Sequence, residues 1–130
     1  MTGIRTVFIH NPKGVIMSKT AMDLVNEAKQ IIKEVDIDGA NALIADGAIA
    51  LDIRETAEFE AGNIPNSHHI PRGVLEFKIG SHDAFQDKAA PIVIYCKSGG
   101  RSALAAVALA QLGYSNVCSM AGGYNAWAQS

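Results

Sequence analysis

The sequence predicts an α/β domain built on about five mostly parallel strands, with helices on both faces of the sheet. Three observations support this fold class. Short apolar runs alternate along the chain with stretches of helical periodicity. The strongest runs are apolar nearly throughout, which is typical of strands covered on both faces. The chain of 130 residues, 48% apolar and 18% charged, has the length and composition of one globular domain.

We place the domain at residues 18–130 and treat the first 17 residues as a separate arm. Residues 1–17 hold a short apolar run and an Asn-Pro-Lys-Gly turn, followed by a second methionine, Met17. An extra strand, a flexible arm and a segment ahead of the natural start are three alternatives that the sequence leaves open.

The first half of the domain is predicted to begin with an amphipathic helix. Thr20 and Asp23 have the spacing of a capping box, and apolar residues then recur with helical spacing as far as Val35. A strand at 48–53 is expected because its residues are apolar nearly throughout. The other elements expected here are a strand at 35–37, a helix at 39–45 and a helix at 55–61, the last ended by Gly62 and Pro65.

The second half contains the most hydrophobic strand of the chain, at 91–96. An alanine-rich helix follows at 102–112, and Gly113 is expected to cap its carboxyl end. Three shorter elements complete the prediction: a strand at 67–70 that is stopped by Pro71, a strand at 117–120 and a helical turn at 124–128.

Composition and charge argue against several classes of protein. The formal net charge of −2, with both signs mixed along the chain, predicts neither a nucleic-acid nor a membrane-lipid partner. The apolar runs are too short for a membrane span, and the run near the amino end does not resemble a signal peptide. Cys96 and Cys118 are too few for a disulfide-stapled scaffold, so we expect free thiols and a cytoplasmic protein.

No metal and no cofactor are predicted. His68 and His69 are adjacent in a short strand, so their side chains should point to opposite faces and cannot share one ion. His10 and His82 have no paired ligands at a useful spacing. Cys118 is expected to be a small core residue, because free cysteine is among the most buried residue types.

Cys96 is the candidate nucleophile because of its surroundings. It ends the strand at 91–96, and ligands of parallel sheets bind beyond the carboxyl ends of the strands. Two glycines let the next loop turn tightly with its N–H groups pointing inward, and the following helix adds its positive end. The charges of Lys97 and Arg101 also favour a thiolate. The predicted active-site loop comprises Lys97, Ser98, Gly99, Gly100, Arg101 and Ser102.

Four segments resemble, in register, the rhodanese-like family. The segment 96–102 matches its Cys-x-x-Gly-x-Arg-Ser loop, and 51–59 is similar to its Asp-x-Arg strand end and Glu-aromatic helix. The segment 62–71 resembles its Gly-His-Ile-Pro-Gly-Ala and Ile-Pro motifs, and 121–127 its Gly-Gly-x-x-x-Trp motif. The matches run from about residue 36 to residue 128. Two departures, Asn63 for histidine and Asn66 for glycine, fall in a turn segment, where asparagine is tolerated.

The resemblance implies a sulfurtransferase. The Cys96 thiolate would take sulfur from a small anionic donor such as thiosulfate, form a persulfide, and pass the sulfur to a nucleophilic acceptor. Thiols, cyanide and protein persulfides are the partners that this chemistry implies. Lys97 and Arg101 would attract the donor, while loop amides hold the charged intermediate. A second role for Arg101 is open, namely bracing the loop through a carboxylate such as Asp52.

Two other functions compete with sulfur transfer. Cysteine-dependent phosphatases and arsenate reductases also close a cysteine loop with an arginine, but with five intervening residues and usually a preceding histidine. Here four residues separate Cys96 from Arg101 and Tyr95 precedes, which favours sulfur over a tetrahedral phosphate. A non-enzymatic rhodanese-like binding module is the other alternative. Such modules typically lack the cysteine, so the complete loop favours catalysis.

Overall fold

The computed structural model describes residues 18–130, so the alternatives for residues 1–17 lie outside the described part of the chain. Five strands form one sheet in which every neighbouring pair is parallel, in the order β1-β5-β4-β2-β3. The predicted α/β fold class is therefore confirmed. The strands are β1 (Lys33–Val35), β2 (Ile49–Asp52), β3 (His68–His69), β4 (Ile92–Tyr95) and β5 (Val117–Met120).

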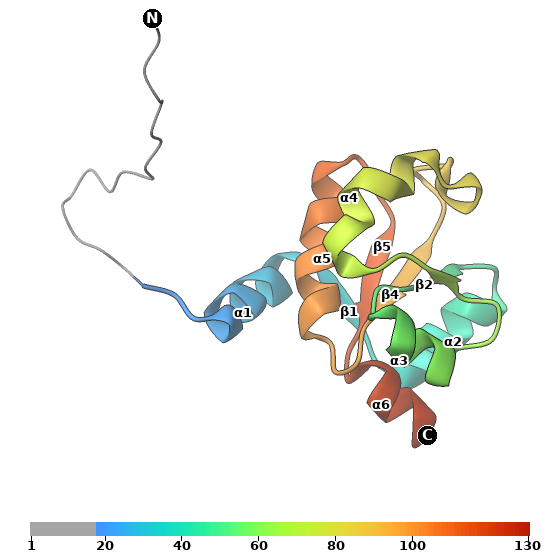
Figure 1. Cartoon of the computed structure of the whole chain (residues 1–130), viewed down its shortest axis with the longest axis horizontal. Helices are drawn as coiled ribbons and strands as arrows, with labels where there is room; N and C mark the ends of the chain where they lie inside the picture. Colours follow the sequence, from blue (N-terminus) through green and yellow to red (C-terminus); the bar gives the residue numbers. More distant parts are fainter. Residues whose placement is uncertain (1–17) are drawn as a thin grey trace, which may run out of the picture.

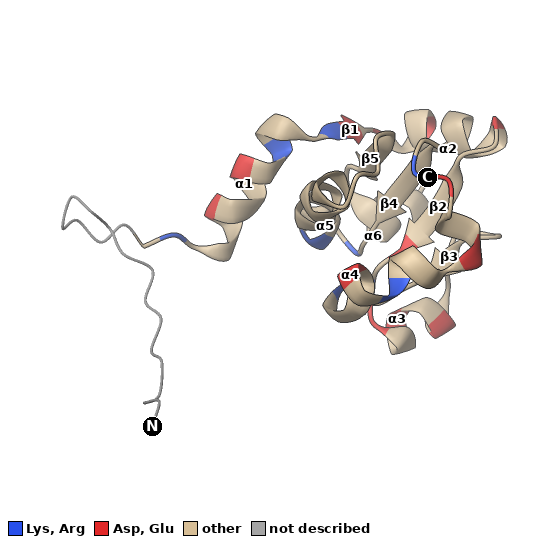
Figure 2. Ribbon diagram, turned by 90° about the horizontal axis from the view of Figure 1, so that it is seen from above, with Lys and Arg blue, Asp and Glu red and all other residues tan. Residues whose placement is uncertain are grey.

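Helices cover both faces of this sheet, as the sequence predicts (Figure 1). One face packs against α5 and against the short segments around α4, and the other packs against α2 and α6. α1 lies on the outer side of α5, away from the sheet (Figures 1 and 2). The helices are α1 (Ala21–Ile31), α2 (Ile37–Ala45), α3 (Thr56–Ala61), α4 (Leu75–Lys78), α5 (Gly100–Gln111) and α6 (Gly123–Ala128).

The central strand β4 is buried along its whole length, which explains why its sequence is continuously apolar. Ile92 and Ile94 face one core layer, and Val93 and Tyr95 face the other. Because successive residues of a strand alternate between faces, β4 contributes to both layers and ends where Cys96 begins the loop.

The sequence placed the boundary between the first helix and the first strand too late. α1 ends at Ile31, and Ile32 has extended backbone angles (φ −97°, ψ 167°). Lys33 to Val35 then pair with β5, and the side chain of Asp36 accepts a 2.8 Å hydrogen bond from the Gly39 amide to start α2. Pairing with β5 thus overrides the helical spacing of the apolar residues after position 31.

Short helices also occupy a segment to which the sequence assigned no element. Between Pro71 and Pro91 the chain forms α4, flanked by single 3₁₀ turns at Arg72–Val74, Ile79–Ser81 and Asp83–Phe85. Each turn is too brief to show a periodic pattern, so sequence periodicity could not reveal it. Leu75, Ile79 and Phe85 are buried there and cover one face of the sheet.

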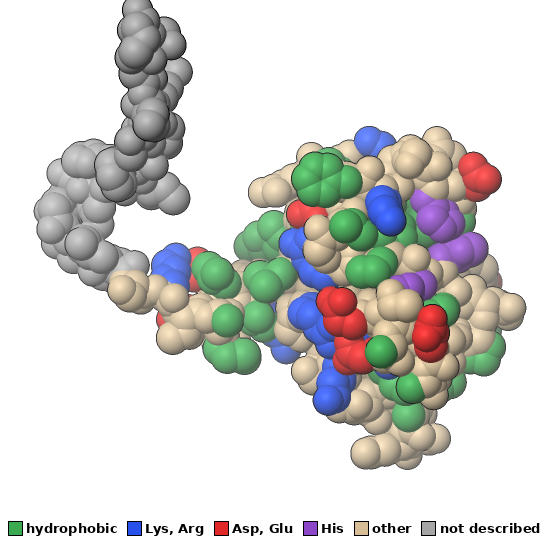
Figure 3. Space-filling view, viewed as in Figure 1, with side chains coloured by type: hydrophobic (Ala, Val, Ile, Leu, Met, Phe, Trp, Pro, Cys, Tyr) green, Lys and Arg blue, Asp and Glu red, His purple; other side chains and the backbone are tan. Residues whose placement is uncertain are grey.

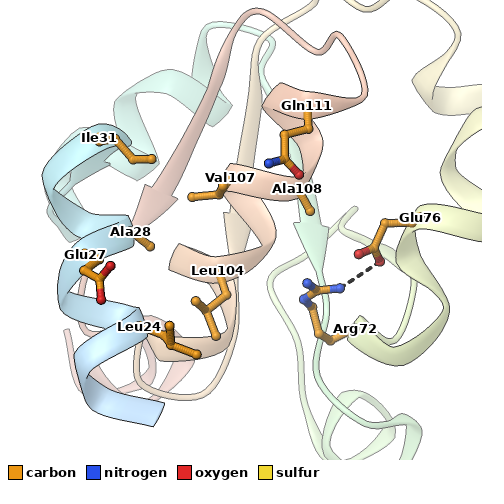
Figure 4. A pocket seen from close by; sticks show the side chains of 10 residues that line it. All are labelled: Leu24, Glu27, Ala28, Ile31, Arg72, Glu76, Leu104, Val107, Ala108 and Gln111. Atoms are coloured by element: carbon orange, nitrogen blue, oxygen red, sulfur yellow. Dashed lines mark hydrogen bonds and ion pairs between the residues drawn. The ribbon is translucent and has the colours of Figure 1, made fainter. Parts of the chain in front are cut away.

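The apolar stripe of α1 is buried only in part. Val25 and Ala28 pack against α5, whereas Leu24 is 47% exposed and Ile31 is 75% exposed. Beside them lies a groove of about 430 Å³ between α1, α5 and an Arg72–Glu76 ion pair of 2.8 Å (Figure 4).

The surface charge agrees with the mixed composition. On the face shown in Figure 3, basic side chains lie next to acidic ones rather than forming a broad patch of one sign. Among residues 18–130 no helix has both the length and the apolar character that crossing a membrane requires.

Candidate active site

The strand-to-helix turn after β4 wraps around the sulfur of Cys96. The residue is 1% exposed, and its Sγ accepts hydrogen bonds from the Gly99 amide at 3.1 Å and the Ser102 amide at 3.3 Å. Gly99 has φ +108°, a left-handed conformation that costs glycine little and other residues more. Gly100 is already the first residue of α5, so only Gly99 supplies the turn that the sequence attributed to both glycines.

These hydrogen bonds lower the pKa of Cys96. Burial alone would raise it, because the charged thiolate loses water, but four donors outweigh burial. They are the Ser102 hydroxyl and the backbone amides of Ser102, Gly99 and Ser98. The main causes that lower this pKa are hydrogen-bond donors, whereas the sequence pointed also to the charges of Lys97 and Arg101.

Ser102 is a contact of the sulfur through its side chain as well. Its Oγ lies 3.5 Å from Cys96 Sγ, 3.2 Å from the Gly99 carbonyl and 2.8 Å from Ser119 Oγ. Ser102 and Ser119 are both fully buried. Ser119 was not predicted as a site residue; the only indication in the sequence is that a small polar residue interrupts the short apolar strand β5.

Arg101 does brace the loop, but its partner is not Asp52. The Arg101 guanidinium donates to both carboxylate oxygens of Glu58 on α3, at 3.0 and 3.2 Å. This pair holds the start of α5 against α3. The hydrogen bond from Arg101 is the main cause that lowers the pKa of Glu58 to about 2. Glu58 is therefore a second site residue that the sequence analysis did not single out.

Asp52 binds Arg54 instead. The Arg54 side chain donates to both Asp52 oxygens, at 2.7 to 3.1 Å, and the pair is almost completely buried. The two residues are two positions apart at the end of β2, so they reach the same side of the chain. Arg54 also donates to the Gly62 carbonyl at 2.6 Å and lies 4.1 Å from the centre of the Tyr124 ring. Through Arg54, Asp52 thus supports Gly62 and α6, not Arg101.

The amino end of α6 holds the loop from the other side. The Tyr124 amide donates to the Cys96 carbonyl at 2.8 Å, and the Asn125 amide donates to the Lys97 carbonyl at 3.0 Å. Gly123 permits this approach, because a Cβ there would lie 2.5 Å from the Lys97 carbonyl carbon and 2.6 Å from the Cys96 oxygen. This close approach explains why the second residue of the Gly122-Gly123 motif is glycine.

The remaining loop residues lie at the surface, and the two asparagines that depart from the family motif fit their turn segment. Lys97 and Ser98 are exposed on the outside of the loop. Asn66 has φ +66°, so asparagine takes the left-handed turn position as expected, and the Asn63 side chain donates to the Phe59 carbonyl at 3.0 Å.

Cys118 lies in a different part of the core from Cys96. It pairs with Val93, three residues before Cys96, and packs on the opposite face of the sheet. Three strand residues span about 10 Å, beyond the reach of a disulfide. Both cysteines are free thiols, and burial raises the pKa of Cys118. The expectation of a buried core residue is confirmed.

The side chains of His68 and His69 point in different directions, as expected for neighbours in a strand. The His69 ring stacks on Phe59 at 4.5 Å, whereas His68 makes edge contacts with His82 and Phe85. Within residues 18–130 no three His, Cys, Asp or Glu side chains gather in a way that could hold a metal ion.

The Glu58–Arg101 pair predicts an acid-sensitive contribution to stability. A carboxyl whose pKa is lowered on folding stabilises the fold above its unfolded pKa, near 4.5, and this stabilisation is lost as the pH falls toward about 2. Glu58→Gln should therefore be less stable than wild type at pH 7, with the difference shrinking below about pH 4.5. Urea unfolding as a function of pH measures this. Glu60→Gln, at an exposed position of α3, is the matched control, and an equal pH dependence of the two variants would contradict the assignment.

Two sulfurtransferases are similar to this chain in sequence. A protein of Allochromatium vinosum named sulfurtransferase is 33% identical over 101 residues, which cover 76% of this chain and 91% of that protein. Thiosulfate sulfurtransferase GlpE of Pseudomonas savastanoi pv. phaseolicola is 34% identical over 95 residues, covering 73% of this chain and 86% of GlpE.

Solved structures share the fold. A Rhodopseudomonas palustris protein of unknown function, described as a possible tyrosine phosphatase, superposes with a TM-score of 0.79 at 32% identity, covering 88% of this chain and 93% of that one. The human single-domain sulfurtransferase TSTD1 superposes with a TM-score of 0.68 at 29% identity, covering 75% and 96%. The rhodanese-like domain family itself matches residues 36–130. The predicted resemblance is thereby confirmed, and the chain belongs to the rhodanese-like domain family.

Proposed function

We propose that this protein is a sulfurtransferase that carries sulfane sulfur on Cys96, taking it from thiosulfate or a similar small anionic donor. The observation that carries the proposal is the pair of backbone amides, of Gly99 and Ser102, that donate hydrogen bonds to the Cys96 sulfur. The names of the relatives support the same reaction class. We place the reaction in the cytoplasm, where both cysteines stay reduced.

The reaction has two displacement steps. In the first, the Cys96 thiolate attacks the outer sulfur of thiosulfate; an S–S bond forms to Cys96, and the bond to sulfite breaks with its electron pair on sulfite. In the second, a nucleophile such as a thiolate or cyanide attacks the outer sulfur of the persulfide, and the Cys96 thiolate leaves. No net proton transfer is needed in either step. The protein therefore has to stabilise an anionic sulfur throughout.

The residues around the sulfur supply that stabilisation. Amides fixed in the loop and at the start of α5 face the charge without reorganising during the reaction. Glu58 holds both terminal nitrogens of Arg101, so bracing is the role that the geometry supports best for this arginine. Lys97 is exposed on the outside of the loop and is our candidate for attracting the anionic donor.

Phosphate hydrolysis is the second candidate, because the Rhodopseudomonas palustris relative is described as a possible tyrosine phosphatase. The loop of this chain has four residues between Cys96 and Arg101, and both terminal nitrogens of Arg101 are engaged by Glu58. In this arrangement the paired N–H groups of Arg101 are directed at Glu58, whereas a bidentate grip on a phosphate needs two parallel N–H groups directed at the ligand. The geometry therefore favours sulfur transfer.

Intact mass spectrometry tests the proposal. After incubation with thiosulfate the protein should gain the mass of one sulfur atom at Cys96, and cyanide should remove it as thiocyanate. The same samples are assayed with an aryl phosphate. Absence of the sulfur adduct would overturn the proposal, and aryl phosphate hydrolysis without an adduct would identify the phosphatase. Absence of both activities would leave a binding module.

A further inference from the structure

One buried polar side chain near the sulfur has no part in the reaction described above. Among residues 18–130 the fully buried polar or charged residues are Asp52, Ser102 and Ser119, and Asp52 is satisfied by Arg54. Ser119, on β5, contacts Ser102 Oγ at 2.8 Å. A buried hydroxyl costs free energy unless it is hydrogen-bonded, so this contact determines how the Ser119 hydroxyl points.

Counting hydrogen atoms assigns the direction of this hydrogen bond. Ser102 has one hydroxyl hydrogen and three neighbours: Cys96 Sγ, the Gly99 carbonyl and Ser119 Oγ. The carbonyl only accepts, and a thiolate sulfur only accepts. If Ser102 donated to Ser119, it could donate to neither. If Ser119 donates to Ser102, both buried hydroxyls are satisfied. The Ser102 hydrogen is then shared between two acceptors: the Gly99 carbonyl, to which it donates at 3.2 Å, and the Cys96 sulfur at 3.5 Å once that sulfur is an anion.

We propose that Ser119 is a positioning residue for sulfur transfer: its hydroxyl donates to Ser102 and thereby leaves the Ser102 hydrogen free to turn from the Gly99 carbonyl to the Cys96 sulfur anion. The two hydroxyl dipoles then run head to tail toward the sulfur, and each polarises the other. These contacts run from Ser119 on β5 to Ser102 on α5 and then to Cys96 after β4. Because β5 pairs with β4, the sheet holds the Ser119 hydroxyl in place.

This inference rests on the proposed function for its importance, but its test does not need a sulfur donor. The rate at which iodoacetamide alkylates Cys96, measured from pH 4 to 10, reports the fraction of thiolate directly. The charged groups near the sulfur, Lys97 and the Arg101–Glu58 pair, stay unchanged in every variant compared. The alkylation rate therefore tests the role of Ser119 even if the protein does not transfer sulfur.

Ser119→Ala should raise the pKa seen in the alkylation profile by about 0.5 to 1, which is a roughly three- to tenfold lower thiolate fraction below that pKa. Ser119→Cys keeps the size of the side chain with a weaker donor and should lie between wild type and Ser119→Ala. Ser119→Thr keeps the hydroxyl and should restore the wild-type profile. If the alanine variant does not fold, the cysteine variant carries the comparison.

A double-mutant cycle separates positioning from simple packing. Ser102→Ala removes the direct donor and should raise the pKa of Cys96 by itself. In that background Ser119→Ala should have no further effect, because Ser119 acts through Ser102. An unchanged profile for the folded Ser119 variants would overturn the inference. So would a full effect of Ser119→Ala in the Ser102→Ala background.

Discussion

Cys96→Ser is expected to abolish sulfur transfer, with turnover lowered by more than about 10³-fold and no sulfur adduct after incubation with thiosulfate. A serine hydroxyl is not ionised at neutral pH and cannot carry sulfur as a persulfide, whereas the hydrogen bonds from Gly99 and Ser102 lower the pKa of the Cys96 thiol. Thiocyanate production from thiosulfate and cyanide measures the turnover.

Cys118→Ala is the matched control for this experiment. Cys118 is buried on the opposite face of the sheet, and burial raises the pKa of its thiol. The variant should lose some stability through the small cavity but keep the adduct and the turnover per folded molecule. Retention of the sulfur adduct in Cys96→Ser, or its loss in Cys118→Ala, would show that Cys96 is not the sulfur carrier.

Gly123→Ala is the second change from which we expect a large effect. The new Cβ would lie 2.5 Å from the Lys97 carbonyl and 2.6 Å from the Cys96 oxygen, and the residue has φ +60°. The left-handed backbone and the overlap together should cost about 2–5 kcal/mol. Because the loop must move to relieve the overlap, adduct formation should slow as well. Thermal unfolding and the rate of adduct formation measure the two effects.

Gly47→Ala separates backbone strain from close approach. Gly47 has φ +105°, but a Cβ there would meet nothing within 4 Å. This variant should therefore lose only the roughly 1–2 kcal/mol of left-handed strain and form the adduct at the wild-type rate. Equal losses of stability in the two variants would show that contact between α6 and the loop is not what Gly123 permits.

The parts of this molecule that could be predicted are those that neighbouring residues determine. The strand β4 is a continuous apolar run, and the turn from Cys96 to α5 is one unbroken segment of chain. Their order along the chain is enough to place the thiol at the carboxyl edge of the sheet. The donors to the sulfur, Gly99 and Ser102, are within six residues of Cys96.

The parts that could not be predicted depend on how distant segments pack. Glu58 and Arg101 are 43 residues apart, and only the docking of α3 shows that this carboxylate, rather than Asp52, binds the arginine. Ser119 reaches Ser102 only because β5 lies beside β4 in the sheet. The end of α1 was misplaced for the same reason, since pairing with β5 takes over at Lys33.

The strand β1 has a consequence for how molecules of this protein meet one another. It precedes the family-matched residues 36–130, yet it supplies the outer neighbour of β5. Without it, β5 would present unpaired N–H and C=O groups, a template for edge-to-edge association with other chains. With it, the outermost strands that residues 18–130 form are β1, with three residues including Lys33 and Glu34, and β3, with two. Short and charged edges discourage such association, so β1 protects the strand that holds Ser119.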